Sequence, residues 1–230
     1  GLVGSEMCIR DSLHLVLPAQ GSECTEKNPS RQKVISKLSK RIVRMLYAES
    51  MLESEDVELY EYGFYILLTH LLFFCFSAIC GLILGVPLEA VLFYVAFSTI
   101  RTYAGGIHAK TETACMGLTA AAIVLSICVI RIFSVHSHEQ IIGCMLLFGT
   151  VAVIALAPLD SPEKPLDSDE KKRYRCISAL ILIGLLAATG LAAIFKLYRI
   201  GDGIAVSLAL EGILLVIGRI CRTRKNERIH

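Results

Sequence analysis

The residues best suited to chemistry lie in one polar stretch, Arg101–Cys115, between two apolar runs. It contains His108 and, seven residues later, Cys115. A cysteine acts as a nucleophile through its thiolate, which a neighbouring imidazole can generate and an imidazolium can stabilise. The same histidine can then return the proton to a leaving amine. The stretch therefore suggests acyl transfer at a peptide bond, with Cys115 as nucleophile and His108 as general base and acid.

This chemistry requires the chain to bend between the two residues. On an unbroken helix, His108 and Cys115 would lie about 10 Å apart along the axis. Gly105–Gly106, just before the histidine, supplies the freedom to turn. Thr111 and Thr113 are candidate N-caps, which would place Cys115 in the first turn of a helix, where unpaired backbone N–H groups favour negative charge.

Each of these features also has an ordinary structural explanation. Cysteines in apolar sequence usually pack as small hydrophobic residues, and the nine cysteines of this chain form no CxxC pair. Paired glycines can simply let helices approach. His136, His138 and Glu139 resemble part of a metal site, but no further ligand is evident and no HExxH motif indicates a zinc protease. We predict neither a metal nor another cofactor.

The elements that must position the polar stretch are predicted to be membrane helices. Hydrophobic residues make up 54% of the chain and charged residues 19%, and the mean hydropathy is +0.61. This composition is typical of integral membrane proteins, and a net charge of +2 gives no indication of a nucleic-acid partner. A span needs roughly 20 mainly apolar residues. Six segments meet or approach this requirement: Tyr62–Leu84, Leu88–Ile100, Met116–Ile132, Gln140–Ala157, Ile177–Phe195 and Gly203–Cys221.

The predicted fold class is therefore all-α, a polytopic membrane protein with about six transmembrane helices. The second segment, Leu88–Ile100, is short, so we expect it to be tilted, shielded by its neighbours or extended by Thr102–Gly105. Gly85-Val86-Pro87 favours a tight turn, and hence a hairpin of the first two helices. Non-helical backbone inside a membrane must be covered by protein or water. We therefore expect a cavity enclosed by the other spans or by a second subunit.

The chain is predicted to have four parts. In Ser30–Met51, basic and apolar residues alternate at helical spacing, which predicts a basic amphipathic helix. We favour contact with the anionic inner leaflet over packing on the domain or against a peptide substrate. The parts are a poorly structured or non-native leader (1–29), a basic amphipathic cytoplasmic segment (30–61), a six-helix transmembrane domain (62–221) and a basic cytoplasmic tail (222–230).

The distribution of basic residues predicts the orientation in the cell membrane. If the amino terminus is cytoplasmic, most Lys and Arg residues fall on the inside, and the outer side holds Arg131, Lys196 and Arg199. This asymmetry is what the positive-inside rule expects. Both termini and the polar stretch are therefore predicted to lie on the cytoplasmic side, where thiols remain reduced.

A second polar stretch, Ala157–Arg175, is predicted on the same side, between the fourth and fifth spans. It contains three prolines and ends in a basic cluster of Lys171, Lys172, Arg173 and Arg175. An ordinary connecting loop would explain it. Alternatively, these side chains form a docking surface for an acidic peptide segment.

Taken together, the two stretches resemble the accessory gene regulator protein B (AgrB) family, membrane cysteine endopeptidases of Gram-positive quorum sensing. Arg101, Gly105-Gly106, His108 and Cys115 match the family pattern Arg…Gly-Gly-x-His-x6-Cys. The stretch from Ala157-Pro158 to Arg175 resembles the family's proline-rich, basic loop. The similarity covers about Ser30–Arg228.

The resemblance implies that Cys115, assisted by His108, cleaves the acidic C-terminal tail from an AgrD-like precursor peptide. A Cys or Ser of the peptide would then close a thiolactone or lactone. It also implies supporting roles for Arg101, Gly105 and Gly106, tail binding by the basic cluster, and a homodimer. The sequence identifies no third catalytic residue. A transporter or a non-catalytic peptide-binding membrane subunit would share the six spans but would leave the peptide intact.

Overall fold

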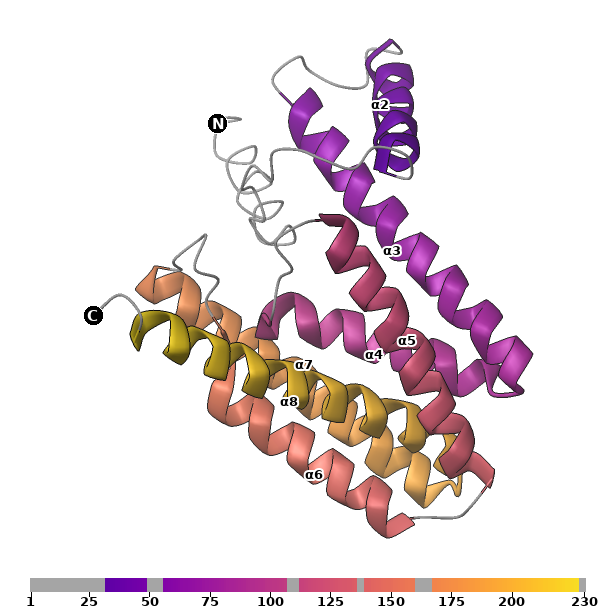
Figure 1. Ribbon diagram of the computed structural model, residues 1–230. Helices are drawn as coiled ribbons and strands as arrows, with labels where there is room; N and C mark the ends of the chain where they lie inside the picture. The colour runs from indigo at the N-terminus through magenta and orange to yellow at the C-terminus, as the bar shows by residue number, and fades with distance from the viewer. Residues whose placement is uncertain (1–31, 49–55, 107–111, 136–138, 160–166, 228–230) are drawn as a thin grey trace, which may run out of the picture. The chain divides into compact units, whose positions relative to one another are not determined.

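The computed structural model describes residues 32–48, 56–106, 112–135, 139–159 and 167–227. Within these ranges every secondary-structure element is an α-helix (Figure 1). The all-α prediction is confirmed, and each predicted apolar segment corresponds to one helix, α3 to α8. The predicted leader, residues 1–29, lies outside the described residues. The helices are α2 (Gln32–Ala48), α3 (Val57–Leu84), α4 (Pro87–Ala104), α5 (Glu112–Val135), α6 (Glu139–Leu156), α7 (Ser168–Ile194) and α8 (Tyr198–Glu227).

Four helices in the described part of the chain are long and apolar enough to cross a membrane by length and composition. They are Val57–Leu84, Thr113–Ser134, Ser168–Ile194 and Tyr198–Thr223. The apolar part of α6, Gln140–Leu156, is shorter, and α4 carries two charged residues, Glu89 and Arg101. These apolar helices indicate a multi-pass membrane protein. Among the described residues, a helix lies at each of the six predicted spans, and four of these helices are long and apolar enough to cross a membrane.

The chain divides into two compact units, Gly1–Phe73 and Phe74–His230, with the division inside α3. The described part of the first unit contains α2 and the start of α3. In α2, Val43 is buried, whereas the Leu38 and Met45 side chains are 46% and 59% exposed. Lys37 and Arg44 are exposed as well. The predicted basic amphipathic helix is thus confirmed, and its contact with a membrane surface stays a prediction.

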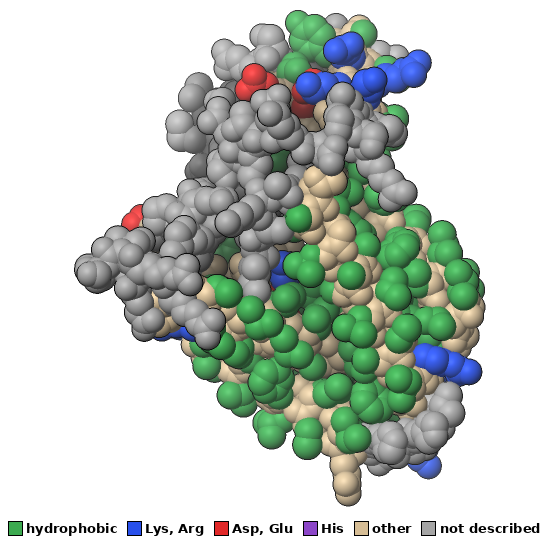
Figure 2. All heavy atoms as spheres, viewed as in Figure 1, with side chains coloured by type: hydrophobic (Ala, Val, Ile, Leu, Met, Phe, Trp, Pro, Cys, Tyr) green, Lys and Arg blue, Asp and Glu red, His purple; other side chains and the backbone are tan. Residues whose placement is uncertain are grey.

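In the second unit, α8 is the central helix, packed against α4, α5, α6 and α7. Half of its most apolar 18-residue stretch is buried, against 22% for α5 and 17% for α7. Apolar side chains also cover the visible outer face of these helices (Figure 2). Leu125, Leu147 and Ile154, for example, are largely exposed. Apolar surface of this extent is what lipid-facing helices require.

The predicted tight turn between the first two spans is confirmed. Gly85, with φ +74°, connects α3 to α4, which begins at Pro87. At the tip, Ser77 Oγ donates a hydrogen bond to the Ala90 carbonyl at 2.8 Å. The second span is α4, which continues to Ala104, four residues beyond the predicted end. The predicted shielding is confirmed, because eight residues of α4 are buried: Glu89, Ala90, Phe93, Tyr94, Ala96, Phe97, Ile100 and Ala104.

Helices α6 and α8 cross closely because glycines meet at the crossing. A Cβ atom on Gly149 would lie 2.4 Å from the backbone carbonyl of Leu208, and one on Gly212 would lie 3.1 Å from Ala152 Cβ. Small residues allow membrane helices to approach in this way.

We expect Gly149→Ala to destabilise the protein by about 1–3 kcal/mol, because the added methyl would force α6 away from the α8 backbone. The measurement is thermal unfolding of the purified protein in detergent micelles. Gly143→Ala is the matched control, since it lies on the same helix and a Cβ there meets nothing within 4 Å. Equal losses of Tm for the two variants would contradict the close crossing.

Candidate functional site

The polar stretch begins where α4 ends. After Ala104 the backbone leaves the helix, with φ +80° and ψ −158° at Gly105 and φ +150° at Gly106. The conformation of Gly105 is essentially restricted to glycine. The predicted turn at the glycine pair is confirmed. His108 lies outside the described residues, so its approach to Cys115 stays a prediction.

The two polar stretches meet at this turn. Gly105 pairs with Leu159 in an isolated parallel bridge, and the Leu159 N–H donates to the Ala104 carbonyl at 2.9 Å. A Cβ atom on Gly105 would lie only 2.5 Å from the Leu159 carbonyl oxygen. Arg175 Nε donates to the Ala157 carbonyl at 3.4 Å and so supports the second stretch from α7. The two hydrogen bonds satisfy the carbonyls of Ala104 and Ala157, which are both buried, as the interior of a membrane protein requires.

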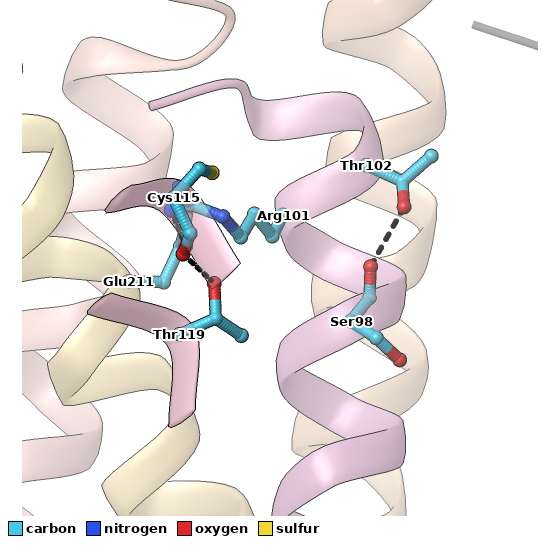
Figure 3. A network of polar contacts seen from close by, with 6 residues as sticks. All are labelled: Ser98, Arg101, Thr102, Cys115, Thr119 and Glu211. Atoms are coloured by element: carbon cyan, nitrogen blue, oxygen red, sulfur yellow. Dashed lines mark hydrogen bonds and ion pairs between the residues drawn. The ribbon is translucent and has the colours of Figure 1, made fainter. Parts of the chain in front are cut away.

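The Arg101 side chain lies beside the same turn. Its Nη1 is 3.7 Å from Oε2 of Glu211, a carboxylate on α8 whose side chain is completely buried. The guanidinium also lies over the Phe97 ring, 5.6 Å from its centroid. A Cβ on Gly106 would lie 2.9 Å from Nη1. Figure 3 shows Arg101 extending from α4 toward the neighbouring helices.

A second ion pair joins the same two helices, but here the acidic residue is on α4 and the basic residue is on α8. The Arg199 guanidinium of α8 binds the carboxylate of Glu89, a fully buried side chain on α4. Glu89 and Arg101 are twelve residues apart, as are Arg199 and Glu211. The two helices therefore run parallel, and the pairs lie about 18 Å apart along them. Together they fix the register of α4 on α8.

The Arg101–Glu211 pair lies about halfway along the apolar part of α8. Glu211 is near the middle of Tyr198–Thr223, the part of α8 that is long enough to cross a membrane. Because α4 ends three residues after Arg101, the glycine pair and Leu159 lie near this level as well. Charges at such depth are costly unless they are paired. The ion pair therefore allows a polar turn well inside the helical bundle.

Cys115 lies in the first turn of α5, which begins at Glu112. This prediction is confirmed. Thr113 is inside the helix and so cannot be the N-cap, whereas Thr111 lies outside the described residues. The Cys115 residue is partly exposed, and its carbonyl accepts a hydrogen bond from Thr119 Oγ1 at 2.9 Å (Figure 3). Helix α5 packs against α4 and α8, the two helices that carry Arg101 and Glu211.

The basic cluster is helical, which corrects the prediction of a loop up to Arg175. Helix α7 begins at Ser168, because Asp167 and Glu170 form a capping box that satisfies its first N–H groups. All four basic residues are exposed. Lys172 pairs with Asp169 at 3.4 Å, and Arg175 donates a hydrogen bond to the Ala157 carbonyl. A role of the cluster in binding peptide stays a prediction.

Comparison with known proteins shows the family. The family model of Accessory gene regulator B matches residues 39–215, which include the polar turn, Cys115 and the basic cluster. The chain belongs to the AgrB family. An AgrB-like protein of Clostridium perfringens (strain SM101 / Type A) is 29% identical over 189 residues, covering 79% of this chain and 87% of the relative.

Two further relatives extend the match. AgrB-like protein 2 of Clostridium perfringens (strain 13 / Type A) is 27% identical to this chain. The alignment covers 83% of this chain and 91% of the relative. An AgrB-like protein of Listeria monocytogenes serotype 4a (strain HCC23) is also 27% identical. The alignment covers 72% of this chain and 83% of the relative. No solved structure matches the chain. Membership of the AgrB family supports a role in agr quorum-sensing peptide processing.

In this AgrB family member, sequence reasoning missed the buried carboxylates Glu89 and Glu211. Each stands in an otherwise apolar run, which is itself a signal of a functional or paired group in a membrane helix. Among the residues that the structure describes, no three His, Cys, Asp or Glu side chains lie close enough to hold a metal ion. His136 and His138 are not among those residues.

Proposed function

We propose that this AgrB family member is a membrane cysteine endopeptidase that removes the C-terminal tail of a precursor signal peptide and closes the remaining segment into a ring. The observation that carries the proposal is the position of Cys115 in the first turn of α5, on a helix packed against α4 and α8. Unpaired backbone N–H groups in that turn favour a thiolate. The family match across residues 39–215 supports the same conclusion.

In the first step, His108 accepts the thiol proton of Cys115, and the thiolate attacks the carbonyl carbon before the tail. The carbon–nitrogen bond then breaks. The imidazolium of His108 gives its proton to the leaving amine, so the tail departs with a free amino terminus and the remaining peptide stays on Cys115 as a thioester.

In the second step, a thiol or hydroxyl of the peptide gives its proton to His108 and attacks the thioester carbonyl. The bond to Cys115 breaks, the thiolate is regenerated and the product is a thiolactone or lactone. Exchange of a thioester for a thiolactone needs no ATP, but water must be kept from the intermediate. The depth of the Arg101–Glu211 pair along α8 supports this, because a site near that level would be shielded from bulk water.

The proposal includes the partner and the orientation. An AgrD-like precursor with an acidic tail would meet the exposed cluster of Lys171, Lys172, Arg173 and Arg175 on α7. Both termini and the site would face the cytoplasm, and the protein would act as a homodimer in the cell membrane. The α2 helix would lie on the inner leaflet with its basic side chains toward the lipid head groups.

We expect the double variant Lys171→Ala/Arg173→Ala to raise KM for the precursor about three- to tenfold and to leave kcat near the wild-type value, since exposed charge pairs each contribute little. The measurement is initial-rate cleavage of the precursor by protein in lipid vesicles. The control, Lys171→Arg/Arg173→Lys, keeps the charge and should keep KM. A fall in kcat with unchanged KM would argue against tail binding by these two residues.

The experiment that tests the function is mass spectrometry of a candidate AgrD-like precursor after incubation with the purified protein in lipid. We expect release of the tail and a second product whose mass is one water below that of the linear fragment. Both should be absent with Cys115→Ala. A precursor that stays intact, although it binds to folded wild-type protein, would refute the peptidase proposal and favour a peptide-binding subunit or a transporter.

A further inference from the structure

We propose that Glu211 is a positioning residue for this site. Its buried carboxylate holds the Arg101 guanidinium against the backbone of Gly106, and so fixes the direction in which the chain leaves α4. The inference rests on the proposed peptidase function, because it assigns a role in that reaction to a residue that would not touch the substrate.

The first support is the environment of the carboxylate. The Glu211 side chain has no exposed surface, and among the described residues neither of its oxygens has a hydrogen-bond partner. Its charge is compensated by Arg101, at 3.7 Å. A buried carboxylate with a single cationic neighbour is costly to keep for packing alone, since an apolar side chain of similar volume would serve as well.

The second support is the contact between the guanidinium and the turn. A Cβ on Gly106 would lie 2.9, 3.5 and 3.7 Å from Nη1, Cζ and Nη2 of Arg101, so the guanidinium lies directly against this glycine. The Phe97 ring lies 5.6 Å from the guanidinium carbon. The Glu211 carboxylate of α8, the Phe97 ring of α4 and the backbone of Gly106 therefore all lie against the Arg101 guanidinium.

The other ion pair of these helices supplies an internal control. Glu89 is as deeply buried as Glu211 and also binds an arginine across the α4–α8 contact. It lies at the opposite end of α4, about 18 Å from Arg101. Loss of either carboxylate would weaken the packing of α4 on α8, but only loss of Glu211 would release the guanidinium beside Gly106.

The test compares Glu211→Gln with Glu89→Gln in the full-length protein in lipid vesicles, by kcat, KM and Tm. We expect Glu211→Gln to lower kcat about 100-fold with little change in KM, since a displacement of the site by about 1 Å is enough for such a loss. Glu89→Gln should lower Tm by a similar amount and keep kcat near wild type. If Glu211→Gln does not accumulate in membranes, Glu211→Asp replaces it and should show the same fall in kcat.

A double-variant cycle then tests whether Glu211 acts through the guanidinium. Gly106→Ala should also lower kcat, because its methyl would displace Nη1 of Arg101. Combined with Glu211→Gln, it should add almost nothing, because both changes release the same group. Combined with Glu89→Gln, its effect should be unchanged.

Two results would overturn the inference without affecting the proposed function. One is Glu211→Gln with wild-type kcat in a protein whose cleavage still depends on Cys115. The other is a Glu211→Gln/Gly106→Ala variant whose losses multiply. If wild-type protein does not cleave the precursor at all, it is the proposed function that fails.

Discussion

Cys115→Ala should lower the rate of precursor cleavage by at least about 10³-fold, to the background of the assay, because it removes the proposed nucleophile. The loss should appear in kcat, since the change leaves the peptide-binding surfaces intact. It should also abolish the covalent intermediate. Wild-type protein quenched with acid during turnover should gain the mass of the linear tail-less peptide less one water, and hydroxylamine should release this adduct, as expected for a thioester.

The chain offers a matched control on the same helix. Cys128 is also a partly buried cysteine of α5, but it lies far from the first turn. Cys128→Ala should keep both the cleavage rate and the acid-stable adduct. In the same way, His108→Ala should abolish cleavage, whereas His70→Ala in α3 should not. Loss of cleavage in Cys128→Ala, or an adduct that persists in Cys115→Ala, would remove Cys115 from the role of nucleophile.

The sequence predicts the helices and the turn of this site, because each of them depends on residues that are close together in the chain. Apolar runs predicted the six helices α3–α8, because only long apolar helices can pair all their backbone groups inside a membrane. Gly105–Gly106 predicted the turn after α4, since glycine alone adopts the required φ values readily. Thr111 and Thr113, as candidate N-caps, predicted a new helix start close to Cys115.

The predicted fifth span begins at Ile177, several residues after the observed start of α7, although the sequence contains a local capping signal for that start. The acidic and basic residues before Ile177 favour a loop, but α7 begins at Ser168. Asp167 and Glu170 have the spacing of a capping box, which outweighs the low hydropathy of the turns that follow. The basic cluster therefore has the fixed geometry of a helix surface.

The contacts across the bundle could not be predicted in this way. Glu89 pairs with a residue 110 positions later, and Glu211 with one equally far before it. Hydropathy can flag an isolated Glu in an apolar run, but only the parallel packing of α4 on α8 determines its partner. The same is true of Leu159, an apolar residue whose backbone, not its side chain, makes the bridge to Gly105.

Gly105→Ala should lower kcat about 100-fold, because it displaces the turn that joins the two polar stretches. Two independent costs act at this position. The backbone adopts φ +80° and ψ −158°, a region in which a residue other than glycine costs about 1–3 kcal/mol. The added Cβ would also lie 2.5 Å from the Leu159 carbonyl oxygen, and a backbone atom cannot move aside as a flexible side chain can. Cleavage assays in lipid and thermal unfolding in detergent measure the two effects.

Gly85→Ala separates these costs. Gly85 also has a positive φ, +74°, but a Cβ there meets nothing within 4 Å. We therefore expect Gly85→Ala to lower Tm through backbone strain and to keep the wild-type kcat, since the α3–α4 turn lies at the other end of α4 from Arg101. If the two variants lose stability equally and both keep kcat, the bridge between Gly105 and Leu159 has no part in the reaction. If Gly105→Ala alone loses turnover, the close approach of these two backbones is what holds the start of the polar stretch in place.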